Sequence, residues 1–130
     1  MITLLLIAHR WEAYATIAWM LASAAYGLAL HRRSLSDTPP RYKAVLCYKA
    51  VLFVGEGLLV AQVLLGLSLL ASGLHPASLL HIVIYGALSP LLLPGAYLYA
   101  RQQGRKHPYL AFGLVSLFLF AFLIRGTFTG

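Results

Sequence analysis

The chain has 130 residues, of which 61% are hydrophobic and only 10% are charged, and its net charge is +7. A soluble domain is about half apolar and a quarter charged, so the composition excludes that class and indicates an integral membrane protein. The basic residues lie in short connections that lack interleaved aromatic side chains, which argues against a nucleic-acid partner.

Four apolar runs follow one another, each longer than the ~20 residues that cross a bilayer. They are uninterrupted rather than alternating, and four strands cannot close a barrel, so we expect helices. Ala22-Ser23-Ala24 has the form of a signal-peptidase site, but we expect this segment to be retained in the first span, which could begin as early as Ile2. The predicted fold is an all-α integral membrane, four-transmembrane-helix up-and-down bundle forming one domain (1–130), with helices at about 9–31, 44–72, 77–100 and 108–127.

The orientation of the bundle follows from its charges. Only Arg10 and Arg125 mark one end, whereas the other eight basic residues flank the first and third connections. Positive charge marks the cytoplasmic side, so both termini and the 72–76 turn are expected on the outer, periplasmic side of a prokaryotic inner membrane. The eight residues are Arg32, Arg33, Arg41, Lys43, Lys49, Arg101, Arg105 and Lys106.

Two histidines are expected near the outer ends of the first and third spans. His9 and His81 each lie about 30 Å of helix before the basic inner boundary of their span, and therefore at similar depth. The first and third helices of such a bundle lie diagonally across the core. Two imidazoles at one depth predict bis-histidine ligation of a b-type haem. The alternative is that each histidine is an interfacial residue bonded to a lipid headgroup or a carbonyl.

Further residues could complete this haem site. Arg10 and Arg125 could pair with the propionates, or could only anchor lipid phosphate. Tyr85, one turn from His81, could bond the edge of the macrocycle or pack in the core. Gln62 and Gly66 lie on a stripe that would admit a planar ring, although ordinary helix packing explains the same pattern. The cofactor-binding residues predicted are His9, His81, Arg10, Arg125, Tyr85, Gln62 and Gly66, with His9 and His81 ligating the haem iron.

Other polar residues have less defined roles. Glu56, in the middle of the second span, could serve a proton relay or contact a quinone, or could bond a Tyr, Ser or Gln of the bundle. His31 and His107 form a pair at the inner end, where we expect solvated, loop-like positions rather than a second haem. No catalytic constellation and no Cys-x-x-Cys-His motif is present, and the single Cys47 excludes an intrachain disulfide.

Residues 62–86, QVLLGLSLLASGLHPASLLHIVIYG, resemble the helix pair of a haem A synthase half-domain, whose architecture is similar to that of four-helix b-type cytochromes. In that family a Gln-x-x-Leu-Gly run ends one helix, and a His that opens the next helix ligates haem. Gln62, Leu65 and Gly66 match the run, and His81 matches the ligand. The resemblance implies a haem at His81. The family's second ligand lies on a helix that this chain lacks, and we expect His9 to replace it.

We therefore expect a small haem-b membrane protein that is an electron-transfer module or a subunit of a respiratory or photosynthetic complex. The alternative is a non-catalytic accessory subunit without a cofactor, packed against a larger complex through its last span, SLFLFAFLI. In either case the expected partners are the lipid bilayer and other membrane-protein subunits.

Overall fold

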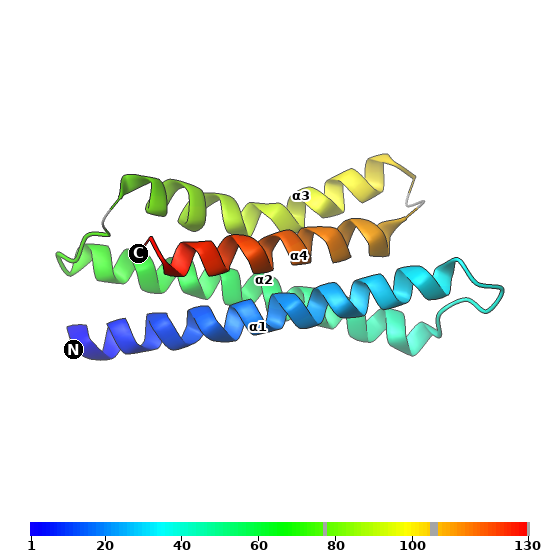
Figure 1. The fold of residues 1–130 in the computed structure, drawn as a ribbon, viewed down its shortest axis with the longest axis horizontal. Helices are drawn as coiled ribbons and strands as arrows, with labels where there is room; N and C mark the ends of the chain where they lie inside the picture. The colour runs from blue at the N-terminus through cyan, green and yellow to red at the C-terminus, as the bar shows by residue number, and fades with distance from the viewer. Residues whose placement is uncertain (77, 105–106, 130) are drawn as a thin grey trace.

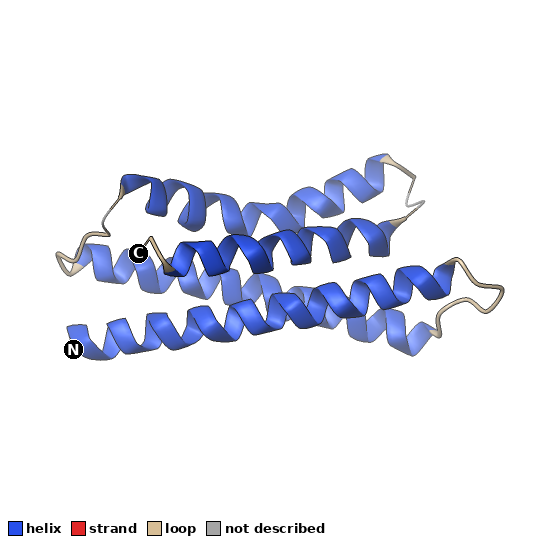
Figure 2. Ribbon diagram, in the orientation of Figure 1, coloured by secondary structure: helices blue, strands red, loops and turns tan. Residues whose placement is uncertain are grey.

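The computed structural model describes residues 1–76, 78–104 and 107–129, and over these residues every regular element is a helix. Figure 2 shows long helices joined by short loops at the two ends of the molecule. The elements are α1 (Ile2–Ser34), α2 (Tyr42–Ala71), the π-helix η1 (His81–Leu88), α3 (Ser89–Gln102) and α4 (Pro108–Thr127).

Four helices are long and apolar enough to cross a membrane, which confirms the predicted four spans. The third span, His81–Gln102, combines η1 and α3. The first helix begins at Ile2 rather than near residue 9, because its first turns are themselves apolar. Helical structure in the third span begins at Leu79 and the π-helix at His81, and residue 77, where we placed the start, lies outside the described residues.

Neighbouring helices run antiparallel and lie side by side (Figure 1). Helix α1 packs against α2 and α4, and α3 packs against the same two helices, whereas α1 has no backbone contact with η1 or α3 over the described residues. The diagonal placement of the first and third spans is therefore observed. We call the end with both termini and the 72–80 connection the terminal end, and the opposite end, with the 35–41 and 103–107 connections, the basic end.

The middle of the bundle is closed by one apolar cluster. Met20, Leu59, Leu93 and Leu119, each from a different helix, are between 0% and 5% exposed. Between the cluster and the basic end, α1 and α4 approach closely because glycines face each other. A Cβ added at Gly27 would lie 3.0 Å from the Cα of Gly113, so small residues set the separation of these helices.

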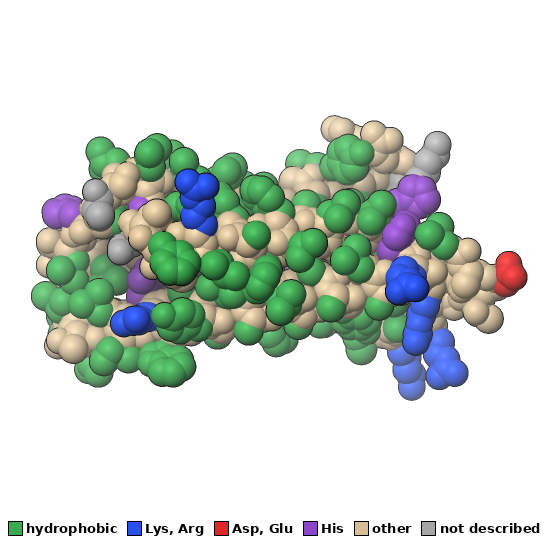
Figure 3. Space-filling model, viewed as in Figure 1, with side chains coloured by type: hydrophobic (Ala, Val, Ile, Leu, Met, Phe, Trp, Pro, Cys, Tyr) green, Lys and Arg blue, Asp and Glu red, His purple; other side chains and the backbone are tan. Residues whose placement is uncertain are grey.

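The outer surface of the bundle is apolar along its length. Figure 3 shows hydrophobic side chains between the two ends, and Lys and Arg gathered mainly at the basic end. Arg105 and Lys106, two of the eight basic residues expected on the cytoplasmic side, lie outside the described residues. A surface that is apolar over several helices matches a lipid environment. Its large exposed side chains include Leu4, Trp11, Phe53, Leu79, Val83, Leu91 and Phe118.

Prolines explain the shape of the third span. Pro90 has no N–H to donate to the carbonyl of Gly86, and Pro94 has none for the carbonyl of Pro90. The wider π-helix lies directly before Pro90, and the Ser89 hydroxyl donates to the carbonyl of Tyr85. The span is bent as the prolines predict, with its middle nearer α4 than its ends (Figure 1). Short π-segments occur frequently at functional sites.

Candidate functional site at the terminal end

The two predicted haem ligands lie at the terminal end on diagonally opposed elements. His9 is half-buried on α1, and His81 is half-buried as the first residue of η1. No backbone contact joins α1 and η1 in the described chain, as expected of diagonal elements.

His9 belongs to a polar network between α1 and α2. Either orientation of the Gln62 amide places it 3.3 Å from a ring nitrogen of His9. In the better satisfied orientation, the NH₂ group of Gln62 donates to the Glu12 carboxylate and, over 3.1 Å, to the backbone oxygen of His9. The Thr16 hydroxyl donates to Glu12 Oε1 at 2.6 Å. The imidazole of His9 is therefore held by a side chain of the neighbouring helix.

Glu12 is a member of this network that sequence reasoning did not select. It is an ionisable residue inside a span, one turn from both His9 and Thr16, and that spacing was the available signal. Gly66 also lies here, since a Cβ added to it would be 3.5 Å from Cε1 of His9. Two of the predicted residues, Gln62 and Gly66, are thus brought to His9.

His81 faces the turn that follows α4. Its Nδ1 lies 3.2 Å from the Thr129 hydroxyl, and its ring centroid is 5.3 Å from that of Tyr85. The Tyr85 ring packs in turn on Phe122, with centroids 4.6 Å apart, and on Gly126, where an added Cβ would approach the ring to 3.0 Å. Tyr85 therefore packs between η1 and α4, the second of the two roles considered for it.

A cavity of about 180 Å³ opens beside His81. Arg125 lines the same cavity, so the structure brings this arginine to the histidine. The hydroxyl-bearing residues Ser78, Tyr85 and Thr129 also line it, and an arginine with hydroxyl groups suits a carboxylate or a phosphate. Arg10 is not brought there, because it is exposed on α1 and its Nε donates to the Tyr14 hydroxyl over 3.4 Å. The lining residues are Ser78, Leu80, His81, Ile84, Tyr85, Arg125 and Thr129.

The remaining polar candidates lie elsewhere. Oε2 of Glu56 is buried without a partner among the described residues, so this atom makes none of the bonds to a Tyr, Ser or Gln that were one of its two possible roles. His31 lies within α1 rather than in a loop, half-buried, and its ring meets that of exposed His107 edge-on at a centroid distance of 5.5 Å. No group of three or more His, Cys, Asp or Glu suited to a metal ion occurs among the described residues.

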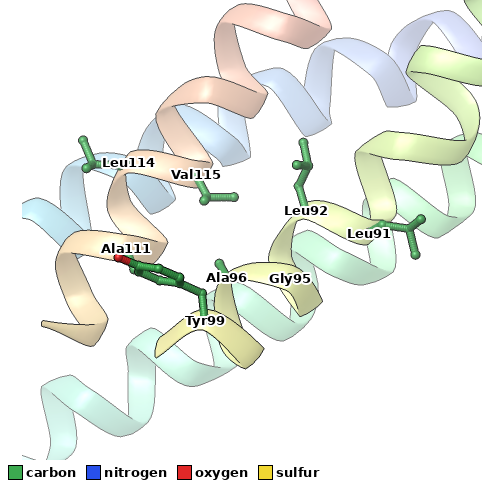
Figure 4. A pocket seen from close by; sticks show the side chains of 8 residues that line it. All are labelled: Leu91, Leu92, Gly95, Ala96, Tyr99, Ala111, Leu114 and Val115. Atoms are coloured by element: carbon green, nitrogen blue, oxygen red, sulfur yellow. The ribbon is translucent and has the colours of Figure 1, made fainter. Parts of the chain in front are cut away.

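A second hollow lies on the lipid side between α3 and α4 (Figure 4). It measures about 390 Å³ and is apolar except for the hydroxyl of Tyr99. Such a lining suits a hydrocarbon chain and disfavours a charged ligand. Its residues are Leu91, Leu92, Gly95, Ala96, Tyr99, Ala111, Leu114 and Val115.

Comparison with protein-family models, with curated proteins and with solved structures found no match for the chain. The resemblance of residues 62–86 to a haem A synthase half-domain therefore stays a prediction.

Proposed function

We propose that the protein binds a b-type haem at the terminal end, where His9 and His81 would hold its iron. It would act as an electron-transfer module or as a subunit of a respiratory or photosynthetic complex. The observation that carries the proposal is the placement of two half-buried histidines on diagonally opposed helices at the same end of the bundle. A haem with two imidazole ligands supplies one-electron transfer without an open position on the iron.

The donor groups present fit this cofactor. Each imidazole has one polar partner, Gln62 for His9 and Thr129 for His81, and such partners orient a ligating ring. Arg125 lies beside His81, where propionates would need a cation. The cavity of about 180 Å³ is smaller than the ~300–1,000 Å³ usual for ligand sites, and no residue of α1 lines it. A haem held by both His9 and His81 would therefore need η1 and α1 to move apart.

The charge distribution supports a location in a prokaryotic inner membrane with the basic end in the cytoplasm. The haem would then lie near the periplasmic face, where it could exchange electrons with a partner on that side. Lipid and neighbouring membrane subunits would cover the exposed apolar side chains.

An absorption spectrum of the purified protein, together with a pyridine haemochrome assay, tests the proposal. We expect a Soret band and near-stoichiometric haem b in the unaltered protein, and loss of most of it in His9→Ala and His81→Ala. His75→Ala is the matched control, because His75 lies in the exposed connection at the same end. A haem-free protein, or full haem retention in both ligand variants, would contradict the assignment.

The second candidate is an accessory subunit without its own cofactor. It is favoured by the exposed aromatic face of α4, where Phe118 is 53% exposed and stacks on Phe122 with centroids 5.5 Å apart. Copurification with a larger complex, combined with a haem-free chain, would support this candidate. A quinone contact at Glu56 stays a separate prediction, and Oε2 of that residue is buried without a partner among the described residues.

A further inference from the structure

The basic half of the bundle holds a group of buried polar atoms that have no hydrogen-bond partner in the described chain. Buried polar atoms nearly always have a partner in the protein or in ordered water, so each exception needs an explanation. The three hydroxyl-bearing residues among them, Ser23, Ser116 and Tyr48, are 1%, 0% and 2% exposed. The atoms are Ser23 Oγ, Ser116 Oγ, Tyr48 OH, His31 Nδ1 and Glu56 Oε2.

Four of these atoms follow one seam between α1, α2 and α4. Ser23, Gly27 and His31 are successive turns on one face of α1. The Tyr48 hydroxyl from α2 lies directly against Gly27, where an added Cβ would also come within 2.9 Å of its Cζ. Gly113 of α4 meets Gly27, and Ser116 lies one turn beyond Gly113. Along α1, an unpartnered polar atom therefore lies at each of three successive turns: Ser23 Oγ, the Tyr48 hydroxyl against Gly27, and His31 Nδ1.

The two serines could have been satisfied locally, as other serines of this chain are. Ser68 and Ser72 each donate to the carbonyl four residues earlier, at 2.8 Å. Ser89, which is 2% exposed, bonds the carbonyl of Tyr85 in the same way. Ser23 and Ser116 make no such bond, and their hydroxyl oxygens are buried without a partner among the described residues.

We propose that the seam binds a file of internal water that runs from Ser23 and Ser116, past Tyr48, to His31 at the basic end. Water is the ligand that fits, because the seam offers small neutral donors and acceptors, and buried water usually bonds about three otherwise unsatisfied groups. An organic ligand would need more space than helices separated by Gly27 and Gly113 leave.

We extend the file to Glu56, whose Oε2 is the fifth orphaned atom and which lies on α2 between Tyr48 and the cluster residue Leu59. Its neighbour Gly55 packs against Met20 of α1, and side chains on a helix lean toward its N-terminus, which for α2 is the basic end. Its carboxyl group would exchange protons with the basic end through the file. The apolar cluster around Met20 and Leu59 separates it from the His9 network at the terminal end.

Water-to-protein magnetisation transfer, measured by solid-state NMR in lipid bilayers, tests the inference on the unaltered protein. With ¹³C-labelled serine we expect transfer to Ser23 and Ser116 to be several-fold faster than to Ser89, which is equally buried but bonded to a carbonyl. Replacement of each serine by alanine assigns the signals. Transfer to Ser23 and Ser116 as slow as to Ser89 would overturn the water file.

The same measurement with ¹³C-labelled glutamate tests the connection to Glu56. We expect fast transfer to its carboxyl carbon, and slower transfer to both Glu56 and Ser23 in Tyr48→Phe, which removes the middle hydroxyl. Tyr26→Phe is the matched control, because the Tyr26 hydroxyl donates to the Ala44 carbonyl at 2.9 Å outside the seam. Slow transfer to Glu56 in the unaltered protein, or equal effects of the two Tyr→Phe changes, would contradict the proton route.

Discussion

At the scale of single residues, the closest interhelical contacts of this protein depend on missing side chains. Gly27 is the clearest case, because it admits both the Tyr48 hydroxyl from α2 and the backbone of Gly113 from α4. A Cβ at this position would overlap the Tyr48 hydroxyl and could be accommodated only if the buried Tyr48 side chain shifted and the α4 backbone gave way at Gly113. One hydrogen atom in place of a methyl group thus sets the spacing of three helices.

We expect Gly27→Ala to lower the free energy of unfolding by about 1–3 kcal/mol, the usual effect of overpacking a dense interior. The check is thermal or denaturant unfolding in detergent. Gly57→Ala is the matched control, since nothing lies within 4 Å of its added Cβ, and this change should leave stability unchanged or raise it by about 0.5–1 kcal/mol. Equal effects of the two substitutions would show that the contact at Gly27 is not limiting.

Residue types alone were enough to select part of the candidate site. His9 and His81 could be chosen because ionisable groups are rare inside spans, and their depth follows from helix rise. The contacts of Gln62 with Glu12, and of His81 with Thr129, could not be predicted, because they depend on the register between helices. That register is set by packing at positions such as Gly27 and Gly113. Nothing in the sequence spacing indicates that these two glycines meet.

At the scale of elements, the third span is the one that departs from regular helix. Pro90 and Pro94 predicted a bend, but the eight-residue π-helix before them was not foreseen. The π-segment decides which way His81 points, because the rotation per residue differs from that of an α-helix. His81 is the first residue of this segment. A change at the prolines that altered the π-helix would therefore change the direction of the His81 side chain.

We expect Pro90→Ala to restore α-helical hydrogen bonding through Gly86 and to rotate His81 away from Thr129. Side-chain ¹⁵N NMR of the five histidines is the measurement, and the His81 signal should shift as it does in Thr129→Val, which removes the same hydroxyl partner. Pro108→Ala is the control, because Pro108 begins α4, where no N–H is needed. An unmoved His81 signal in Pro90→Ala would show that the π-helix does not depend on this proline.

At the scale of the whole molecule, hydropathy was enough to predict four spans and their diagonal arrangement, because lipid admits few alternatives to helices. Orientation is a separate question, decided by the charges at the two ends. Eight of the ten basic residues belong to the first and third connections and their flanks, which predicts that the basic end is cytoplasmic.

Thiol labelling of intact cells measures this orientation. In a Cys47→Ser background, we expect a membrane-impermeant maleimide to label His75→Cys from outside, and to label Ser36→Cys only after permeabilisation. Both positions are exposed and lie in connections at opposite ends. Labelling of Ser36→Cys alone in intact cells would reverse the orientation and would place the predicted haem on the cytoplasmic side.

The helices differ greatly in length, and this has a mechanical consequence. Helix α1 has 33 residues, about 50 Å, whereas α4 has 20 residues, about 30 Å, which is the thickness of bilayer hydrocarbon. Since α4 can lie wholly within the hydrocarbon, the longer α1 must either tilt strongly or extend beyond the headgroups. At the basic end, α1 and α2 both reach farther than α3 and α4 (Figure 1). A pair of helices that projects from the membrane would give soluble proteins a rigid surface to bind on a molecule that lipid otherwise covers.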